Sequence, residues 1–373
     1  MRKYRRGLVL TAALCATFLI YGCQKTEIKE TTAAQTEMTA TVPTSEITGE
    51  KTRVFTDSAG RKVTLPEEIQ KIAPSGPLAQ IVLYTVAPDK LAGLASDFSD
   101  GAKKYIDEKY WGLPKFGQFY GKNANLNMEA LIAAKPDVII DIGEAKKTVK
   151  EDMDALSKQL GIPVVFIEAD LNSMSSAYQM LGEITGETAQ AAKLADYCDK
   201  TMKKSEEAKA SLGADQKKSV YFASGDNGLH TNAEGSIHAR VIEQIGAENA
   251  AKVEKASSGG GSEVSMEQLL LWQPDLILAD SNALYQTITT DSVWSELNAV
   301  KEGHVYLIPS APYSFMSNPP SVNRMIGILW LGNLVYPEQY QGDIKADIKG
   351  FYDLFYHVQL TDAQAEDIVK AGN

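Results

Sequence analysis

Cysteine is scarce in this sequence, with three residues among 373. So few cysteines exclude a disulfide framework as the basis of the fold. Basic residues are also in the minority: 37 lysines and arginines stand against 48 aspartates and glutamates, and the formal charge is −11. A general nucleic-acid binder presents a basic face to phosphate, so this balance argues against nucleic acid as a partner.

The short motifs that mark common catalytic sites are absent as well. The sequence contains no phosphate-binding G-x-x-x-x-G-K-[ST], no zinc-protease H-E-x-x-H and no G-x-S-x-G around a nucleophilic serine. The glycines of residues 257–262 come without a lysine, and we expect a surface loop there. These absences predict a protein that is not an enzyme and has no resident cofactor.

The longest apolar run, residues 7–21, is shorter than the roughly 20 residues that a spanning helix needs. It follows a basic head, MRKYRR, which is typical of a secretory signal. The run ends Ile20-Tyr21-Gly22-Cys23 and resembles the lipobox of bacterial lipoproteins. That resemblance implies removal of residues 1–22 and anchoring of the chain to the cell membrane by a lipid on Cys23. The alternative is an ordinary secretory signal that happens to contain Cys23.

Residues 23–52 follow as a Thr-rich stretch without aromatic residues. Such a stretch buries too little apolar surface to offset its ordering entropy, and we expect a disordered tether. Loss of residues 1–22 removes four basic residues and leaves 33 basic against 48 acidic ones, a charge of −15. Cys198 is then the one remaining thiol, and we expect it to be a small apolar filler on a helix.

Beyond the tether, short apolar runs alternate with segments long enough for crossover helices. This alternation predicts an α/β fold with mostly parallel sheets. A hairpin is expected first, because residues 53–56 and 62–66 flank a turn sequence. The expected strands are residues 71–73, 137–141, 163–167, 219–222, 275–278 and 304–308.

Residues 127–140 and 265–278 repeat each other, with Met, Glu, Leu, Pro, Asp and Ile in the same columns. The copies are too far apart for a solenoid, and two related Rossmann-like lobes fit better. We expect the lobes at residues 53–186 and 214–373, the second with C-terminal helices. Residues 187–213 lack internal glycine and proline up to Leu212 and predict one long rigid helix between the lobes. The alternative is a helix inside one domain.

The lipobox, the tether, residues 56–66 (TDSAGRKVTLP), the paired Met-Glu…Pro-Asp segments and the long helix together resemble one family. It is the iron-complex family (siderophore, haem and cobalamin) of ABC-transporter substrate-binding proteins, and the resemblance covers about residues 53–340. It implies an extracytoplasmic protein, expected to be a monomer, with a ligand cleft between two lobes that close little. It also implies that Glu129 and Glu267 dock onto the ABC permease. The alternative is that each glutamate only favours its helix N-terminus.

Ligands of open α/β lobes bind outside the carboxyl ends of the strands, so the loops after the strands hold the candidate site. We expect Phe119 and Tyr120 to be exposed and to stack on the ligand, or else to cap the lobe core. Clustered His230 and His238 are expected to contact metal or anion, or to be structural. We expect Arg324 either to bind an anionic ligand or to donate hydrogen bonds to loop carbonyls. The full candidate set is Ser75, Gly76, Gln118, Phe119, Tyr120, His230, His238, Arg240, Tyr313 and Arg324.

Hydrogen-bond donors predominate in this set, which favours an anionic ligand. We therefore expect an iron(III) complex of the siderophore type, with no metal bound directly by the protein. One alternative is a molybdate or tungstate oxyanion. Another is a zinc- or manganese-binding lipoprotein, which needs three or four His, Asp or Glu ligands. The first lobe has no histidine, so its share would have to come from carboxylates such as Glu144.

Overall fold

The computed structural model describes residues 51–121, 124–254 and 261–371. The expected signal, Cys23 and the tether up to residue 50 lie outside these ranges, as do residues 257–260 of the expected surface loop. Within the described ranges, no helix combines the length and the apolar character that crossing a membrane requires.

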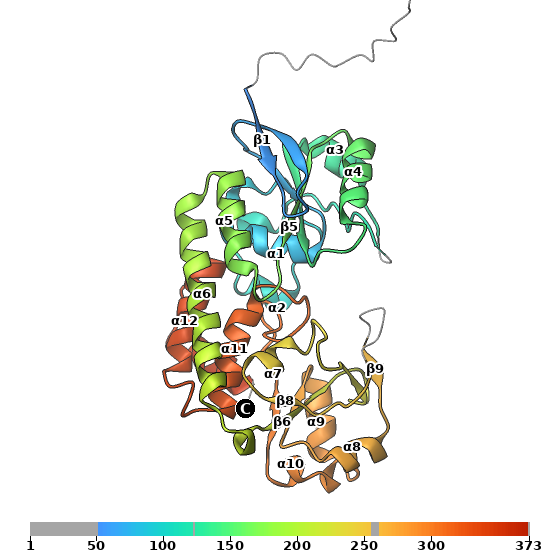
Figure 1. Cartoon of the computed structure of the whole chain (residues 1–373), viewed down its shortest axis with the longest axis vertical. Helices are drawn as coiled ribbons and strands as arrows, with labels where there is room; N and C mark the ends of the chain where they lie inside the picture. Colours follow the sequence, from blue (N-terminus) through green and yellow to red (C-terminus); the bar gives the residue numbers. More distant parts are fainter. Residues whose placement is uncertain (1–50, 122–123, 255–260, 372–373) are drawn as a thin grey trace, which may run out of the picture. The chain divides into compact units, whose positions relative to one another are not determined.

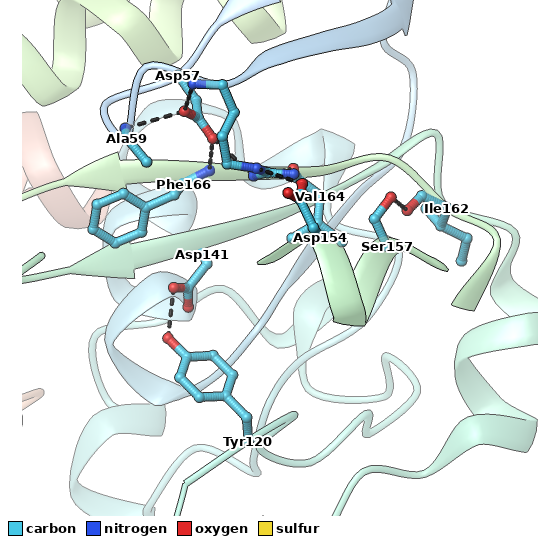
Figure 2. Close-up of polar contacts among 10 residues, drawn as sticks. Asp57, Ala59, Tyr120, Asp141, Asp154, Ser157, Ile162, Val164 and Phe166 are labelled. Carbon is cyan, nitrogen blue, oxygen red and sulfur yellow. Dashed lines mark hydrogen bonds and ion pairs between the residues drawn. The ribbon is translucent and has the colours of Figure 1, made fainter. Parts of the chain in front are cut away.

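The body begins with an antiparallel hairpin of β1 (Thr52–Thr56) and β2 (Lys62–Pro66). Asp57 closes the turn, because its Oδ1 accepts hydrogen bonds from the amides of Ala59 (3.0 Å) and Arg61 (2.9 Å). Its Oδ2 binds the Arg61 guanidinium at 2.9 Å and accepts the amide of Phe166 at 3.2 Å (Figure 2). The turn is thereby fixed to the first sheet.

The first sheet is parallel, in the order β3 (Ile72–Pro74), β4 (Val138–Gly143), β5 (Val164–Glu168). Ile139 in its central strand pairs with Ala73 on one side and Val164 on the other. The first five residues of β4 are buried, as expected for a parallel strand covered on both faces.

The second sheet is also parallel, in the order β11 (Val305–Leu307), β10 (Leu276–Ala279), β6 (Ser219–Ala223), β8 (Glu248–Asn249). Ile277 pairs with Tyr221 and with Val305. A short antiparallel pair, β7 (His230–Thr231) and β9 (Ser262–Glu263), lies beside it. Both sheets confirm the predicted α/β class.

The helices provide the crossovers and a packed layer beside the sheets. They are α1 (Pro77–Val86), α2 (Asp100–Lys103), α3 (Met128–Ala134), α4 (Val149–Leu160), α5 (Met174–Thr185), α6 (Thr188–Ser211), α7 (Arg240–Gln244), α8 (Met266–Trp272), α9 (Asn282–Thr290), α10 (Asn298–Lys301), α11 (Asn323–Val335), α12 (Ile344–Tyr356) and α13 (Asp362–Ala371).

Helix α6 occupies the stretch in which we expected the long connecting helix. Its 24 residues span roughly 36 Å. It packs along α5 and against α11 and α12 (Figure 1). Helix α12 also packs on α1, so the C-terminal helices contact the first lobe as well as the second. Gln190 of α6 donates to the carbonyl of Leu354 at 2.9 Å. This bracing opposes bending of α6.

The sequence repeat forms the same local structure twice. Helices α3 and α8 each end in a residue with left-handed backbone, Lys135 (φ 49) and Gln273 (φ 42). The aspartate that follows in each copy then accepts backbone amides of a neighbouring strand. Asp137 accepts from Lys71 at 2.8 Å, and Asp275 accepts from Ser219 at 2.7 Å. The two lobes therefore share a helix–turn–strand unit.

Candidate ligand-binding cleft

The carboxyl ends of β3 and β4 surround a cavity of about 430 Å³. Prolines 319 and 320, from the long loop after β11, complete its wall from the second lobe. The first lobe contributes four of the expected site residues together with two carboxylates: Ser75, Gly76, Gln118, Tyr120, Asp141 and Glu144. The structure thus brings together most of the residues that we expected from this lobe.

A second cavity, of about 350 Å³, adjoins the first, because Pro77 and Pro319 line both. Tyr313, another expected site residue, lines this second cavity together with Gln80 and Asp280. Its ring also contacts that of Tyr356 in α12, with 6.2 Å between centroids. Tyr313 therefore links the cleft to the helical layer.

The loop that carries Gln118 and Tyr120 is held by backbone contacts. The amide of Phe119 donates to the carbonyl of Ser75 at 2.9 Å. Gln118 donates its side-chain amide to the carbonyl of Tyr120, also at 2.9 Å. Gly117 has a φ of +80, and a Cβ there would lie 2.3 Å from the carbonyl oxygen of Asn125. Only glycine fits at this turn.

Of the two expectations for Phe119, exposure to the ligand was wrong, and burial in the core of the lobe is what the structure shows. Phe119 is only 6% exposed and belongs to an apolar cluster with Phe116, Leu131 and Ile139. Its neighbour Tyr120 is half-buried and lines the cavity. Phe119 therefore lies inside the apolar cluster, whereas Tyr120 packs against that cluster and also reaches the cleft.

Asp141 is the functional candidate that sequence reasoning missed. It lies in β4, is 3% exposed, and accepts hydrogen bonds from the hydroxyls of Ser75 and Tyr120, the latter at 2.5 Å (Figure 2). Burial raises the pKa of Asp141, although the two hydroxyls and the charge of Lys146 oppose the rise. The sequence did contain one sign of this residue, an aspartate inside a run expected to form a buried strand. A buried carboxylate needs hydrogen-bond partners.

His230 and His238 line neither of the two cavities. His230 belongs to β7, where its backbone bridges Ser224. His238 instead places Nδ1 2.6 Å from the hydroxyl of Ser317. Burial, followed by the charge of Arg324, lowers the pKa of His238. Within the described ranges, no three His, Cys, Asp or Glu side chains converge in a way that would hold a metal ion.

Arg324 is almost fully buried, at 1% exposure. It donates to the carbonyls of Ser321 and Ile237, each at 3.2 Å, so it fixes two loops of the second lobe. Burial lowers its pKa to about 10, against the opposing charges of Glu144 and Asp170. Those two carboxylates belong to the first lobe.

Arg240 and Arg324 line neither of the two cavities, but each carries a buried nitrogen without a partner in the described part of the chain. Among the described residues, neither Nη2 of Arg324 nor Nε of Arg240 has a hydrogen-bond partner. Arg240 begins α7, and its charge acts on both Arg324 and Asp170. A buried, unpaired guanidinium N–H is costly, and an anion that accepts it would remove that cost.

Glu129 and Glu267 lie in the first turns of α3 and α8, and both side chains are exposed. Each has an exposed apolar neighbour one turn further along its helix. Ile132 is 58% exposed and Leu271 is 83% exposed. Each lobe therefore presents a carboxylate next to an apolar side chain.

Comparison with known proteins identifies the family. Residues 108–312 match the model of the family described as "Periplasmic binding protein". The molybdate-binding protein MolA of Haemophilus influenzae is 25% identical over 333 residues, covering 82% of this chain and 91% of MolA. YvrC of Bacillus subtilis, described as an uncharacterized ABC transporter substrate-binding lipoprotein, is 26% identical over 90% of this chain and 99% of its own.

A solved structure agrees with both the fold and the family. The ABC transporter solute binding protein from Sulfurospirillum deleyianum superimposes with a TM-score of 0.78 and 29% identity, over 85% of this chain and 98% of that one. The expected two-lobed fold and the resemblance to ABC substrate-binding proteins are thereby confirmed. The chain belongs to the periplasmic binding protein family and is an extracytoplasmic solute-binding protein of ABC transport, not an enzyme.

Proposed function

We propose that this protein captures an anionic iron(III) chelate in the cleft between its lobes and delivers it to an ABC permease. The observation that carries the proposal is the pair of buried, unpartnered N–H donors on Arg240 and Arg324. A charge-assisted hydrogen bond to an anion is among the strongest that such a donor forms. Gln118, Tyr120 and Tyr313, which line the cavities, then position the organic part of the chelate.

The size of the cleft supports a chelate over a small ion. The two adjoining cavities measure about 430 and 350 Å³ and fall within the range of small-molecule sites, roughly 300–1,000 Å³. A tetrahedral oxyanion would leave most of that space to water. Molybdate is nevertheless the second candidate, because MolA is a molybdate-binding protein of which this chain covers 91%.

Delivery to the permease is proposed to use Glu129 and Glu267. Exposed carboxylates at equivalent positions of the two lobes can pair with basic residues at two points of the permease surface, which would fix the orientation of the bound protein. We propose that a lipid on Cys23 anchors the protein to the cell membrane and that residues 23–52 form the tether. We propose further that residues 53–186 and 214–373 form the two lobes, with the helix of residues 187–213 between them. The wild-type protein is proposed to act as a monomer.

The experiment is a calorimetric titration of the full-length chain with a ferric siderophore, haem, cobalamin, molybdate and zinc. Tight binding of a ferric chelate supports the proposal, and tight binding of molybdate alone supports the second candidate. Zinc binding alone would reject both.

Two variants show whether the arginines hold the ligand. Arg324→Gln should weaken chelate binding by roughly tenfold or more, because it removes an ionic donor. Arg53→Gln is the matched control, since Arg53 also donates to two backbone carbonyls, those of Glu183 (3.0 Å) and Ile184 (2.9 Å), but, among the described residues, has no buried nitrogen without a partner. Equal losses in the two variants would contradict the assignment.

A further inference from the structure

Two hydroxyl groups that line the larger cavity already donate their protons to a side chain of the protein. Ser75 and Tyr120 both line the cavity, and both donate to the carboxylate of Asp141, one to each oxygen. Asp141 belongs to β4, Ser75 directly follows β3, and Tyr120 belongs to the loop before α3, so three segments meet at this carboxylate. Figure 2 shows Tyr120 and Asp141 pointing toward one another.

The hydrogen-bonding capacity of these groups sets what the wall can offer. A hydroxyl has one proton to donate and two lone pairs to accept with. Because Asp141 takes both protons, the oxygens of Ser75 and Tyr120 have only lone pairs left for a ligand. These two hydroxyls therefore accept hydrogen bonds from a ligand and donate none, whereas Lys146, which lines the same cavity, is a separate cationic donor.

We infer that Asp141 is a specificity-determining residue that makes this wall select hydrogen-bond donors on the ligand. The inference rests on the proposed function and narrows the ligand to a chelate that carries amide N–H or hydroxyl groups beside its anionic metal core. A bare oxyanion has only acceptor oxygens and would meet lone pairs at the Ser75 and Tyr120 hydroxyls. The two hydroxyls would thus bind donor groups of the ligand, and the arginines would bind its anionic part.

The charged surroundings of Asp141 are compatible with this role. Lys146 lies with Nζ 5.4 Å from the centroid of the Tyr120 ring and stabilises the carboxylate form. Asp152 of α4 acts in the opposite direction. Glu144 lines the same cavity. A proton on Asp141 would release one hydroxyl proton toward the ligand, so the preference depends on the ionised form.

The test compares two ferric catecholate chelates whose ligands differ only in one donor group. Their ligands are N-methyl protocatechuamide, which has an amide N–H, and N,N-dimethyl protocatechuamide, which has none. Molybdate serves as the acceptor-only probe. Affinities are measured by calorimetry with the full-length chain and its Asp141→Asn variant. The asparagine amide donates to one hydroxyl oxygen, which frees that hydroxyl to donate into the cavity.

We expect the wild-type chain to prefer the N–H chelate by about fivefold to tenfold, the equivalent of one net hydrogen bond. Asp141→Asn should reduce that preference to about twofold and strengthen molybdate binding. A merely structural role would weaken all probes by the same factor. An unchanged preference in Asp141→Asn, or an equal loss for all probes, overturns the inference and leaves the proposed function standing. Failure of the wild-type chain to bind either chelate overturns both.

A second variant covers the case in which Asp141→Asn does not fold. Tyr120→Phe removes one acceptor oxygen from the wall and should lower the preference for the N–H chelate about threefold, with little effect on the dimethyl chelate. Tyr285→Phe is the matched control, because Tyr285 lies on α9 and lines neither cavity. Equal behaviour of the two tyrosine variants overturns the inference.

Discussion

Tyr120 donates its phenolic hydrogen to Asp141 across 2.5 Å, inside the wall of the larger cavity. The contact joins a loop residue whose conformation depends on Gly117 to a carboxylate inside a central strand. The hydroxyl of Tyr120 therefore ties this loop to the central strand of the first sheet.

The first prediction concerns the pH dependence of stability. Burial raises the pKa of Asp141 above its unfolded value of about 3.9. Between those two values the native state binds more protons than the unfolded state, so this group lowers stability as pH rises. Relative to Asp141→Asn, the wild-type chain should lose free energy of unfolding as pH rises from about 4, and the difference should level off above the native pKa.

Urea unfolding of both chains at a series of pH values measures this difference, and groups unaffected by the substitution cancel. Lys146 and Asp152 act on Asp141 from neighbouring segments, so their charges are included in the native pKa. A difference that stays constant with pH would show that Asp141 titrates normally.

The second prediction separates the two adjacent aromatic residues. Phe119→Ala should destabilise the fold by about 3–5 kcal/mol, because it leaves a cavity in an apolar cluster. Tyr120→Phe should change stability much less and alter ligand preference instead. Denaturant unfolding and calorimetric binding on the same samples distinguish the roles. A Phe119→Leu variant that keeps its stability but loses ligand selectivity would contradict this prediction and show that Phe119 takes part in ligand binding.

Much of the fold was predictable because it follows from local chemistry. The run at 137–141 predicted β4, since short apolar segments bounded by proline and charge form buried parallel strands. The paired segments predicted two equivalent helix–turn–strand units because Pro136 and Pro274 each end a helix. The long helix was expected from the absence of glycine and proline.

The site was less predictable because it depends on contacts between distant segments. Sequence spacing predicted that His230 and His238 lie in loop segments after a strand, but the backbone of His230 pairs with Ser224 and forms part of β7. Loops have no side-chain period, so nothing local showed which of Phe119 and Tyr120 faces inward. Asp141 is recognisable only through Ser75 and Tyr120, which reach it from other parts of the chain.

The third prediction concerns the turn that positions Gln118 and Tyr120. Gly117→Ala should destabilise the fold by about 1–3 kcal/mol, because alanine is strained at a φ of +80 and its Cβ collides with Asn125. Ligand affinity should fall with it. Gly112→Ala is the control, since a Cβ there meets nothing within 4 Å. Thermal unfolding measures the effect, and similar melting temperatures for the two variants would contradict the prediction.

The fourth prediction concerns permease docking. Glu129→Gln with Glu267→Gln should lower ligand uptake by cells roughly tenfold or more, because both ends of the electrostatic register are lost. Ligand affinity of the purified chain should not change. Glu206→Gln, an exposed carboxylate on α6, is the control. Wild-type uptake by the double variant, at equal protein levels, would reject docking through these residues.

The central claim, capture of an anionic iron(III) chelate, is tested most directly on the protein isolated with its natural ligand. Native mass spectrometry combined with elemental analysis gives both the mass and the metal of the bound species. We predict iron together with an organic chelator that carries amide N–H or hydroxyl groups, at one per chain. Molybdenum without an organic component, or zinc alone, would contradict the account.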